Sequence, residues 1–296
     1  MNKLLVILLL ALVGGFQVQA SNPARDSLCN HSSLLIPHSS LRPVVSAFTL
    51  GVGTDHLCNT YLTPIHYSGW RTELGYERLQ AMKFNPEQWI MRLDLRFWLG
   101  RDHNPAHTAS IVQMGFRPSW SMLWRHRVGD GFTLAVGPNI GAEIGGLYLS
   151  RNGNNPASVQ ASVNVGATAH AAWNGRILGL PLTLRYQPTM PLMGAFFMPD
   201  YDELYYEIWL GNHSKLAHFG WPGNFFRLDN LLTADLHFGN TNLRLGYRCE
   251  IFSSKANNIV ARDISHIFVI GLTTEWISLR PGSKSISEAK IISALY

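Results

Sequence analysis

Charge is scarce in this chain of 296 residues. Asp, Glu, Lys and Arg make up only 15% of it, against about 25% in an average soluble domain. Glycine, uncharged polar residues and aromatics fill the deficit, while the hydrophobic share is 46%. This composition excludes a disordered chain and a coiled coil. It also leaves too little surface charge for a soluble secreted β protein.

Cysteine is rare as well, and basic residues do not cluster. Cys29, Cys58 and Cys249 show neither CxxC spacing nor even pairing, which excludes a zinc knuckle and a disulfide framework and leaves room for one bridge at most. The net charge of +5 is spread along the chain without blocks of Lys or Arg. No nucleic-acid partner is therefore expected.

Long apolar runs are absent after the first twenty residues. Those residues carry Lys3, the apolar run 4–13 and a small-residue site ending at Ala20, which predicts a cleaved secretory signal peptide over 1–20. The run is shorter than the roughly 20 residues that a membrane-spanning helix needs. Residues 21–42 are then expected to form a periplasmic N-terminal segment.

The pattern that the sequence does contain is a period of two. In 89–99 the apolar residues share one face of an extended chain, and Arg92, Asp94 and Arg96 share the other. In 132–145 apolar residues alternate with small or polar ones over the whole length. Strands of this length exceed the roughly 5–6 residues of soluble sheets and match membrane strands of about 9–11 residues with extensions.

The fold predicted from this pattern is all-β. We expect an up-and-down antiparallel transmembrane β-barrel of about ten strands over residues 43–279, with twelve strands as the alternative. The expected strands are 43–54, 69–80, 88–100, 108–126, 131–149, 158–174, 178–190, 229–239, 241–254 and 264–279. The segment 205–210 is a candidate strand, lid or short helix; a spanning strand there would break the even number, so we assign it to a loop.

Connections between these strands alternate in length, as in a barrel with short periplasmic turns. Tight-turn residues occur at 128–131 and 239–242. The longer segments, expected outside the cell, are 55–68, 101–107, 150–157, 191–228 and 255–263. Of these, 191–228 is the long extracellular loop. Both termini then fall in the periplasm, and 280–296 forms a C-terminal tail.

Tryptophans recur at or near the ends of the expected strands. They are Trp70, Trp89, Trp98, Trp120, Trp124, Trp173 and Trp276. Membrane proteins place such amphipathic rings at the level of the lipid headgroups. The spacing therefore favours a membrane barrel over a soluble core rich in tryptophan.

Several short segments carry a family resemblance. They are Arg151–Ala157, Leu180–Gln187, Pro191–Gly194, Tyr205–Ile208 and Ser265–Gly271. Over about Phe48 to Leu279 the chain resembles an uncharacterised family of outer-membrane β-barrel proteins, a domain of unknown function, from Bacteroides-type bacteria. The resemblance implies secretion and a membrane barrel but no activity. The tail after the last strand departs from the family pattern, and Gly271 with Trp276 gives only a partial barrel-assembly signal.

If the apolar phase faces lipid, the charged phase lines the lumen. Eight basic and seven acidic side chains then point inward: Arg71, Arg92, Arg96, Arg117, Arg125, Arg185, Arg244, Arg248, Glu73, Glu77, Asp94, Glu143, Asp235, Glu250 and Glu275. The predicted lumen network centres on Arg92, Asp94, Arg96, Glu73, Glu77, Glu143, Arg185, Arg244 and Arg248. Charges in so narrow a lumen are expected to pair and close it. A selective narrow channel and a charged binding or catalytic cleft are the alternatives.

Histidines gather in the segments expected on the outer side. They are His56, His66, His103, His107, His213 and His218. His103 and His107 are four residues apart, but loop residues separate them, so we predict no metal site and no cofactor. Three adjacent pairs supply hydrolase residue types at the rim: Asp55–His56, Asp102–His103 and His213–Ser214. Nothing in the sequence shows a nucleophile, a base and an orienting group converging.

Two loop regions are candidate ligand-binding surfaces. Arg151, Asn152 and Asn154 lie in a loop rich in Asn and Gly, which is also typical of a rigid multi-turn loop. Tyr205, Tyr206 and Trp209 lie in the aromatic-rich segment 191–228, which either stacks on an extracellular glycan or peptide or packs as a lid over the barrel mouth.

The function predicted is that of a closed-lumen structural or ligand-binding protein of the outer membrane. Its expected partners are outer-membrane lipid, the barrel-assembly machinery and an extracellular glycan or peptide. The first alternative is an outer-membrane hydrolase acting on lipid or peptide at the rim, and the second is a narrow selective channel.

Overall fold

A computed structural model describes most of the predicted barrel. The described residues are 42–129, 131–153, 155–177, 179–201, 203–211, 215–238, 241–276 and 292–294. The signal peptide predicted at 1–20, Cys29 and all but the last residue of the segment 21–42 lie outside them. The tail predicted at 280–296 lies outside them apart from 292–294.

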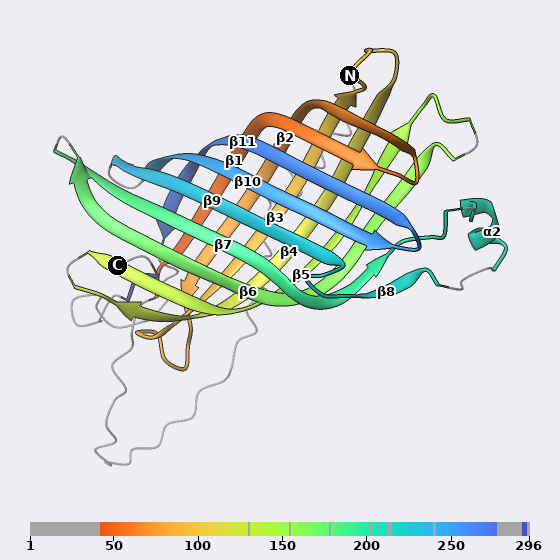
Figure 1. Cartoon of the computed structure of the whole chain (residues 1–296). Coiled ribbons are helices and arrows are strands. Elements are labelled where there is room, and N and C mark those ends of the chain that lie inside the picture. The colour runs from red at the N-terminus through yellow and green to blue at the C-terminus, as the bar shows by residue number, and fades with distance from the viewer. Residues whose placement is uncertain are drawn as a thin grey trace, which may run out of the picture. The chain divides into compact units, whose positions relative to one another are not determined.

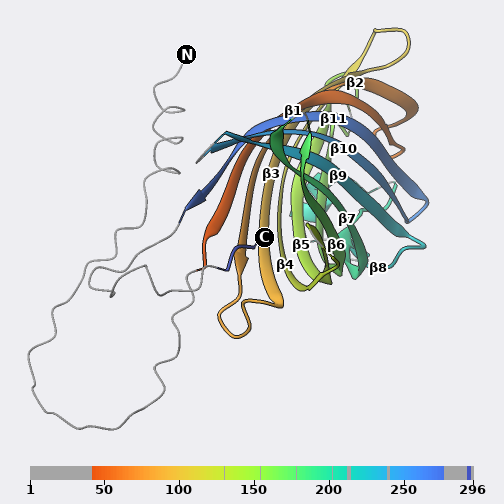
Figure 2. The same ribbon diagram turned by 90° about the vertical axis from the view of Figure 1, so that its left-hand side faces the viewer.

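Ten long strands form one closed antiparallel barrel in the described part of the chain (Figures 1 and 2). They are β1 (Val44–Asn59), β2 (Thr63–Ala81), β3 (Trp89–His103), β4 (Ser110–Arg127), β5 (Phe132–Leu149), β6 (Ala157–Ile177), β7 (Leu180–Phe197), β9 (Phe225–Phe238), β10 (Thr241–Ala256) and β11 (Ile259–Trp276). Each pairs with its neighbours in chain order, and β1 pairs with β11 from Val44↔Trp276 to Asn59↔Ala261. The predicted all-β, up-and-down barrel of ten strands is confirmed.

The segment 205–210 does not cross the barrel. It contains a short helix, α2 (Tyr205–Trp209), inside the connection from β7 to β9. The same connection contains β8 (Ala217–Gly220), which pairs with the end of β7 and extends the wall there. The even strand number therefore stands. Among the described residues, no helix is long and apolar enough to cross a membrane.

We call the end of the barrel that carries this connection the α2 end, and the opposite end, where β1 begins and β11 ends, the terminal end. In Figure 1 the α2 end is on the right. Since each strand runs the full length of the wall, β1 begins and β11 finishes at the same end.

Cys58 and Cys249 are both free thiols.

Two segments predicted as long loops are in fact mostly strand. In 55–68, β1 continues to Asn59 and β2 starts at Thr63, and in 255–263 only Asn257 and Asn258 separate β10 from β11. Both asparagines have positive φ, 49° and 60°, as a tight two-residue hairpin turn requires. The prediction was wrong because outward residues turn polar near this end, while backbone pairing does not depend on an apolar outer face. The connection predicted at 191–228 likewise shrinks to 198–224.

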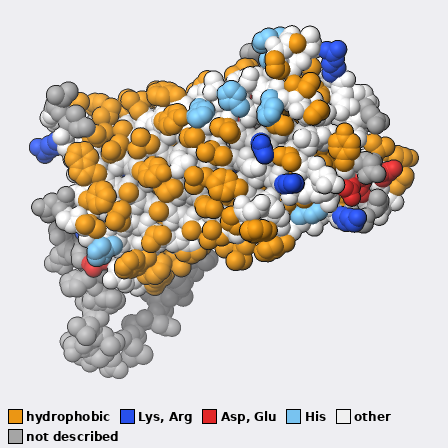
Figure 3. Space-filling model, viewed as in Figure 1, with side chains coloured by type: hydrophobic (Ala, Val, Ile, Leu, Met, Phe, Trp, Pro, Cys, Tyr) orange, Lys and Arg blue, Asp and Glu red, His pale blue; other side chains and the backbone are white. Residues whose placement is uncertain are grey.

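The wall alternates between an exposed apolar face and a buried polar one. In β5, Val136 and Ile140 are exposed, whereas Thr133 and Asn139 are buried. Figure 3 shows hydrophobic side chains spread over the visible wall, with most of the visible Lys, Arg and His side chains toward the α2 end. Trp98 was predicted at the headgroup level near a strand end, but its side chain is only 3% exposed. Trp98 follows Asp94 and Arg96 at intervals of two residues in the same strand, so its side chain points inward as theirs do.

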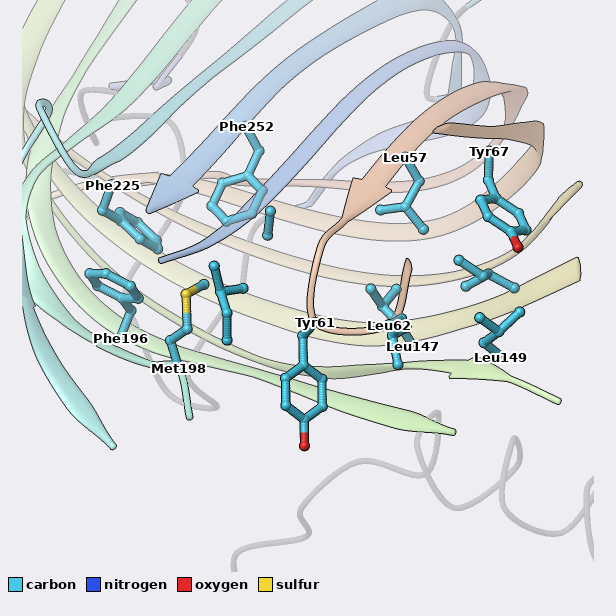
Figure 4. Close-up of a cluster of buried hydrophobic side chains, with 13 residues drawn as sticks. Leu57, Tyr61, Leu62, Tyr67, Leu147, Leu149, Phe196, Met198, Phe225 and Phe252 are labelled. Atoms are coloured by element: carbon cyan, nitrogen blue, oxygen red, sulfur yellow. The ribbon is translucent and has the colours of Figure 1, made fainter. Parts of the chain in front are cut away.

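Apolar clusters close the lumen at both ends. The α2-end cap consists of Leu57, Tyr61, Leu62, Tyr67, Ile111, Leu147, Leu149, Phe196, Met198, Phe225, Phe252, Ile259 and Ala261. Figure 4 shows the phenyl rings of this cap turned toward one another, with the leucines continuing the cluster across the interior. The terminal-end cap consists of Val45, Leu79, Ile90, Leu123, Ala135 and Ala294.

A charge on the outer face of β5 should cost more than one on its inner face. We expect Ile140→Arg to lower the free energy of unfolding by about 2–4 kcal/mol, because in the predicted membrane placement it puts a guanidinium in hydrocarbon near the midplane. Thr133→Arg, at the inward mouth of the same strand, is the matched control and should cost less. Urea titration of the refolded barrel in lipid vesicles measures both. Equal costs would show that the assigned outer face does not meet lipid.

Candidate functional site: a closed, ion-paired lumen

Between the two caps the lumen is filled by ion pairs. Among the described residues, eight arginines form salt bridges there: Arg71, Arg92, Arg96, Arg117, Arg185, Arg227, Arg244 and Arg248. Their carboxylate partners are Asp55, Glu73, Glu77, Asp94, Glu143, Asp229, Asp235, Glu250 and Asp263. All of these side chains are at most 15% exposed. We call this set the lumen network.

Glu77 is the hub of the network toward the terminal end. Its carboxylate accepts hydrogen bonds from Arg92 at 2.8 Å, Arg185 at 3.0 Å and Arg244 at 2.6 Å. These arginines come from β3, β7 and β10, so one carboxylate links distant parts of the wall across the lumen. Asp235 balances part of the positive charge of these three arginines. Its two carboxylate oxygens accept hydrogen bonds from the Arg244 guanidinium at 2.7 and 3.0 Å.

Arg96 and Glu250 organise the middle of the lumen. The Arg96 guanidinium reaches Asp229 at 2.5 Å, Asp94 at 3.3 Å and Glu250 at 3.3 Å. Glu250 in turn accepts from Arg117 at 2.7 Å. Each charge named in this layer has at least two partners of opposite sign, and their attraction offsets the desolvation cost of burying it.

Glu143 and Glu73 extend the network toward the α2 end. Glu143 on β5 accepts from Arg117 at 2.7 Å and from Arg227. On the other side of the lumen, Glu73 accepts from Arg248 at 2.6 Å. Nine of the ten long strands, all but β6, thus contribute a side chain to the network in the described part of the chain.

Trp98 lies between two of the guanidiniums. Its ring centroid is 4.9 Å from the Arg71 guanidinium carbon and 5.1 Å from that of Arg117, so the ring packs between two cations. A side chain at Gly115, the cross-strand partner of Trp98, would collide with the ring. Glycine at this position therefore makes room for the indole inside the barrel.

The structure brings together all nine residues of the predicted lumen network. Arg92, Asp94, Arg96, Glu73, Glu77, Glu143, Arg185, Arg244 and Arg248 all take part in the salt bridges above. Four partners were missed: Asp55, Arg227, Asp229 and Asp263. Arg227 lay in a segment assigned to a loop, although Arg227, Asp229 and Asp235 keep the inward spacing of two in β9.

The terminal-end mouth is closed by the chain itself. Arg125 donates to the backbone carbonyls of Ser293 at 2.6 Å, Pro86 at 3.0 Å and Glu87 at 3.1 Å. Ala294 is 1% exposed and packs in the terminal-end cap. Glu275, predicted inside the lumen, is exposed at this end and accepts from the Ser293 hydroxyl at 2.7 Å.

The candidate Asp–His pairs do not converge. Asp55 and Asp102 are fully buried inside the lumen, where Gln113 donates to both carboxylates. His56 follows Asp55 directly and is exposed on the outer face, since adjacent strand residues point to opposite sides of the wall. His103 is likewise separated from Asp102. The pair His213–Ser214 lies outside the described residues.

Histidine clustering does not produce a metal site in the described part of the chain. The His103 and His107 rings lie 5.7 Å apart, but no group of three or more His, Cys, Asp or Glu side chains among the described residues could hold a metal ion. We therefore interpret the contact between the His103 and His107 rings as packing within a loop.

Two of the predicted ligand-binding residues instead hold the loops in place. Asn152 donates to the Leu62 carbonyl at 3.2 Å and accepts from the Asn155 amide. The Tyr205 hydroxyl accepts from the Val159 amide at 2.7 Å. Tyr205 also packs edge-on against Tyr61, 5.8 Å between centroids. Burial raises the pKa of the Tyr61 phenol, which keeps its proton and donates to the Glu203 carbonyl at 2.9 Å.

The remaining predicted residues of this surface differ in exposure. Tyr206 is 68% exposed and Trp209 84% exposed. Arg151 is exposed and donates to the Thr108 carbonyl at 3.1 Å. Asn154 lies outside the described residues. Only α2 therefore presents large rings to the outside among the residues named from sequence.

Comparisons with solved structures give only distant likenesses. The outer membrane protease OmpT from Escherichia coli is 7% identical with a TM-score of 0.45, covering 82% of this chain and 99% of that one. Neisserial surface protein A is 11% identical with a TM-score of 0.31, covering 78% and 99%. An outer membrane channel from Pseudomonas putida F1 is 8% identical with a TM-score of 0.37, covering 84% and 100%. The architecture rests on the strand register and not on these matches.

Among curated proteins none matches the chain. A family model described as "Protein of unknown function (DUF3316)" matches residues 4–283. The predicted resemblance to an uncharacterised family is confirmed to that extent, while the Bacteroides-type origin stays a prediction.

Removing the charge of Glu77 should destabilise the barrel strongly. We expect Glu77→Gln to lower the free energy of unfolding by about 3–5 kcal/mol, because three buried guanidiniums lose their shared counter-charge. Glu207→Gln, at an exposed position in α2, is the matched control and should cost less than about 1 kcal/mol. The measurement is the urea or thermal midpoint of the folded, unheated band on gels. A loss at Glu77 no larger than at Glu207 would mean that water solvates the lumen.

Proposed function

The chain belongs to the family described as "Protein of unknown function (DUF3316)", and we propose that it is an outer-membrane barrel with a closed lumen. The description of the family names no activity. The α2 end of the barrel is a binding surface. The binding surface faces the cell exterior, and its ligand is a glycan or a peptide. Both termini lie in the periplasm, and the barrel-assembly machinery inserts the protein after cleavage of the signal peptide predicted at 1–20.

The distribution of side chains supports the membrane placement. Exposed apolar residues recur along the outward phase of strands all round the barrel, as Phe48, Leu74, Ile144 and Phe268 illustrate. A closed barrel satisfies every backbone group of its wall, so it can present such a face to hydrocarbon. Outer-membrane lipid is therefore its first partner.

The observation that carries the closed lumen is the continuity of its filling. The α2-end cap, the lumen network and the terminal-end cap follow one another along the barrel axis. Glu77, Glu250 and Glu143 each hold two or more arginines across the lumen. Barrels that leave a water channel have about 16 strands or more, whereas side chains fill the interior of smaller ones.

The binding surface rests on exposed aromatic rings in the connection 198–224. Its most exposed large side chains in the described residues are Trp209, Tyr206, Leu210, Phe219, Tyr201 and Trp221. Amphipathic rings on a rigid scaffold suit stacking on sugar or peptide groups. Tyr205 anchors α2 to β6, so Tyr206 and Trp209 are presented from a fixed base.

The wild-type barrel should not conduct ions. We expect planar bilayers with the purified protein to show no stable single-channel currents, because the two caps and the lumen network fill the lumen with side chains. A known channel-forming porin, reconstituted in parallel, checks that insertion occurs. Large and stable currents from the wild-type barrel, together with an unchanged unfolding midpoint in Asp94→Ala, would replace the closed lumen with a selective channel.

Ligand binding should depend on the exposed rings of α2. A glycan array and a displayed-peptide library identify ligands of the wild-type barrel, and we expect Tyr206→Ala/Trp209→Ala to weaken the best of them at least tenfold. Trp276→Ala, which removes an exposed ring at the terminal end, is the control and should bind normally. Binding that survives loss of both α2 rings would move the binding surface elsewhere.

A further inference from the structure

A groove crosses the outer wall near the terminal end, with an apolar part and a polar part. The apolar part has a volume of about 460 Å³ and is lined by Trp124, Leu134, Val136, Ala169, Ala171 and Tyr186. The polar part has a volume of about 500 Å³ and is also lined by Glu87, Gln88, Arg125, Arg127 and Ile292, which places it at the rim of the terminal-end mouth. The Arg125 guanidinium is already engaged by backbone carbonyls there. Trp124 and His126 line both parts, so the two meet.

Strand register explains why the wall is hollowed there. Across the sheet, Trp124 pairs with Val136 and Val136 with Ala169, while Leu134 pairs with Ala171 and Ala171 with Tyr186. The two alanines of β6 thus form a low floor between larger side chains on both sides. Both volumes fall in the range of about 300–1,000 Å³ that small-molecule sites occupy.

Aromatic rings place this groove at a membrane interface. Trp124 is 45% exposed and Tyr186 45% exposed, and Trp and Tyr side chains settle at the level of the headgroups. The His126 ring stacks on Trp124, with the centroids 5.9 Å apart. The apolar floor therefore lies at the depth of acyl chains, and the polar part lies at the depth of the headgroups.

The polar part carries charge of both signs. Arg127 supplies a guanidinium, whose planar fork suits a phosphate, and His126 supplies a further nitrogen donor. Glu87 lines the same hollow and opposes a purely anionic headgroup. A headgroup that combines a phosphate with a primary ammonium complements all three side chains.

We propose that this groove binds one phospholipid of the phosphatidylethanolamine type. One acyl chain lies over Ala169 and Ala171, the phosphate meets Arg127 and His126, and the ammonium meets Glu87. The site lies at the opposite end of the barrel from the α2-end surface, and its polar part borders the terminal-end mouth, where Arg125 and Ile292 line it. It rests on the membrane placement proposed above, and because the terminal end faces the periplasm there, the lipid comes from the inner leaflet.

Native mass spectrometry of the delipidated, detergent-solubilised barrel tests the site. Titration with palmitoyl-oleoyl phosphatidylethanolamine should give one tightly bound lipid per barrel. Ala169→Phe fills the floor with an apolar ring and should weaken binding at least tenfold. Ala234→Phe is the matched control on the outward face of β9, outside the groove, and should bind as the wild type does.

Two further variants test the headgroup contacts. Arg127→Gln should weaken binding of this lipid and of palmitoyl-oleoyl phosphatidylglycerol alike, whereas Glu87→Gln should abolish the preference for phosphatidylethanolamine. Arg176→Gln, an exposed arginine at the same end, should change neither. These variants distinguish recognition of a phosphate from recognition of the whole zwitterionic headgroup.

Each of the following results would overturn the proposal. Unchanged binding in Ala169→Phe, or an equal loss in Ala234→Phe, would show that the lipid binds elsewhere or without specificity. Dimers of the wild type that disappear in Ala169→Phe would assign the groove to a second copy of the chain. A wild-type protein that fractionates as soluble would remove the membrane placement together with the site, whereas a heat-modifiable outer-membrane protein without bound lipid would remove the site alone.

Discussion

The structure depends on the pairing of its first strand with its last. β1 and β11 run in continuous register from Val44↔Trp276 to Asn59↔Ala261, so the sheet has no free edge among its ten long strands. Closure satisfies the backbone hydrogen bonds of the whole wall and separates an inside from an outside. Once the wall is closed, successive residues of each strand point alternately into the lumen and to the exterior, so a period of two in the sequence separates the two sides.

That division explains why the lumen is ionic. Polar residues on the inner phase lose bulk water, and buried charges are tolerated only with partners. The network meets this requirement by sharing: Glu77 serves three arginines, and Arg96 reaches three carboxylates. Buried ion pairs add little stability over a hydrocarbon filling, so the value of the set lies in fixing one arrangement of the strands across the lumen.

Sequence reasoning predicted the fold and the inner phase because both follow from a period of two. It placed Arg92, Asp94 and Arg96 on one face before any strand was seen. It failed where the outer face turns polar, so the ends of β1 and β10 were assigned to loops. It also could not identify Tyr205 as an anchor, because the hydrogen bond to Val159 joins residues 46 positions apart. Alternation reports which side of the wall a residue faces, and it does not report which residues meet across the lumen.

The wall also limits where function can reside. Adjacent residues such as Asp55 and His56 are separated by the thickness of the sheet, so no dyad forms from neighbours in a strand. The lumen is filled, and its terminal-end mouth holds residues 292–294 of the chain itself. Contacts with other molecules are thereby displaced to the connection that carries α2 and to the outer wall. In the proposed membrane placement those two surfaces face different surroundings, water and lipid, so a barrel with a closed lumen can bind at both without coupling them.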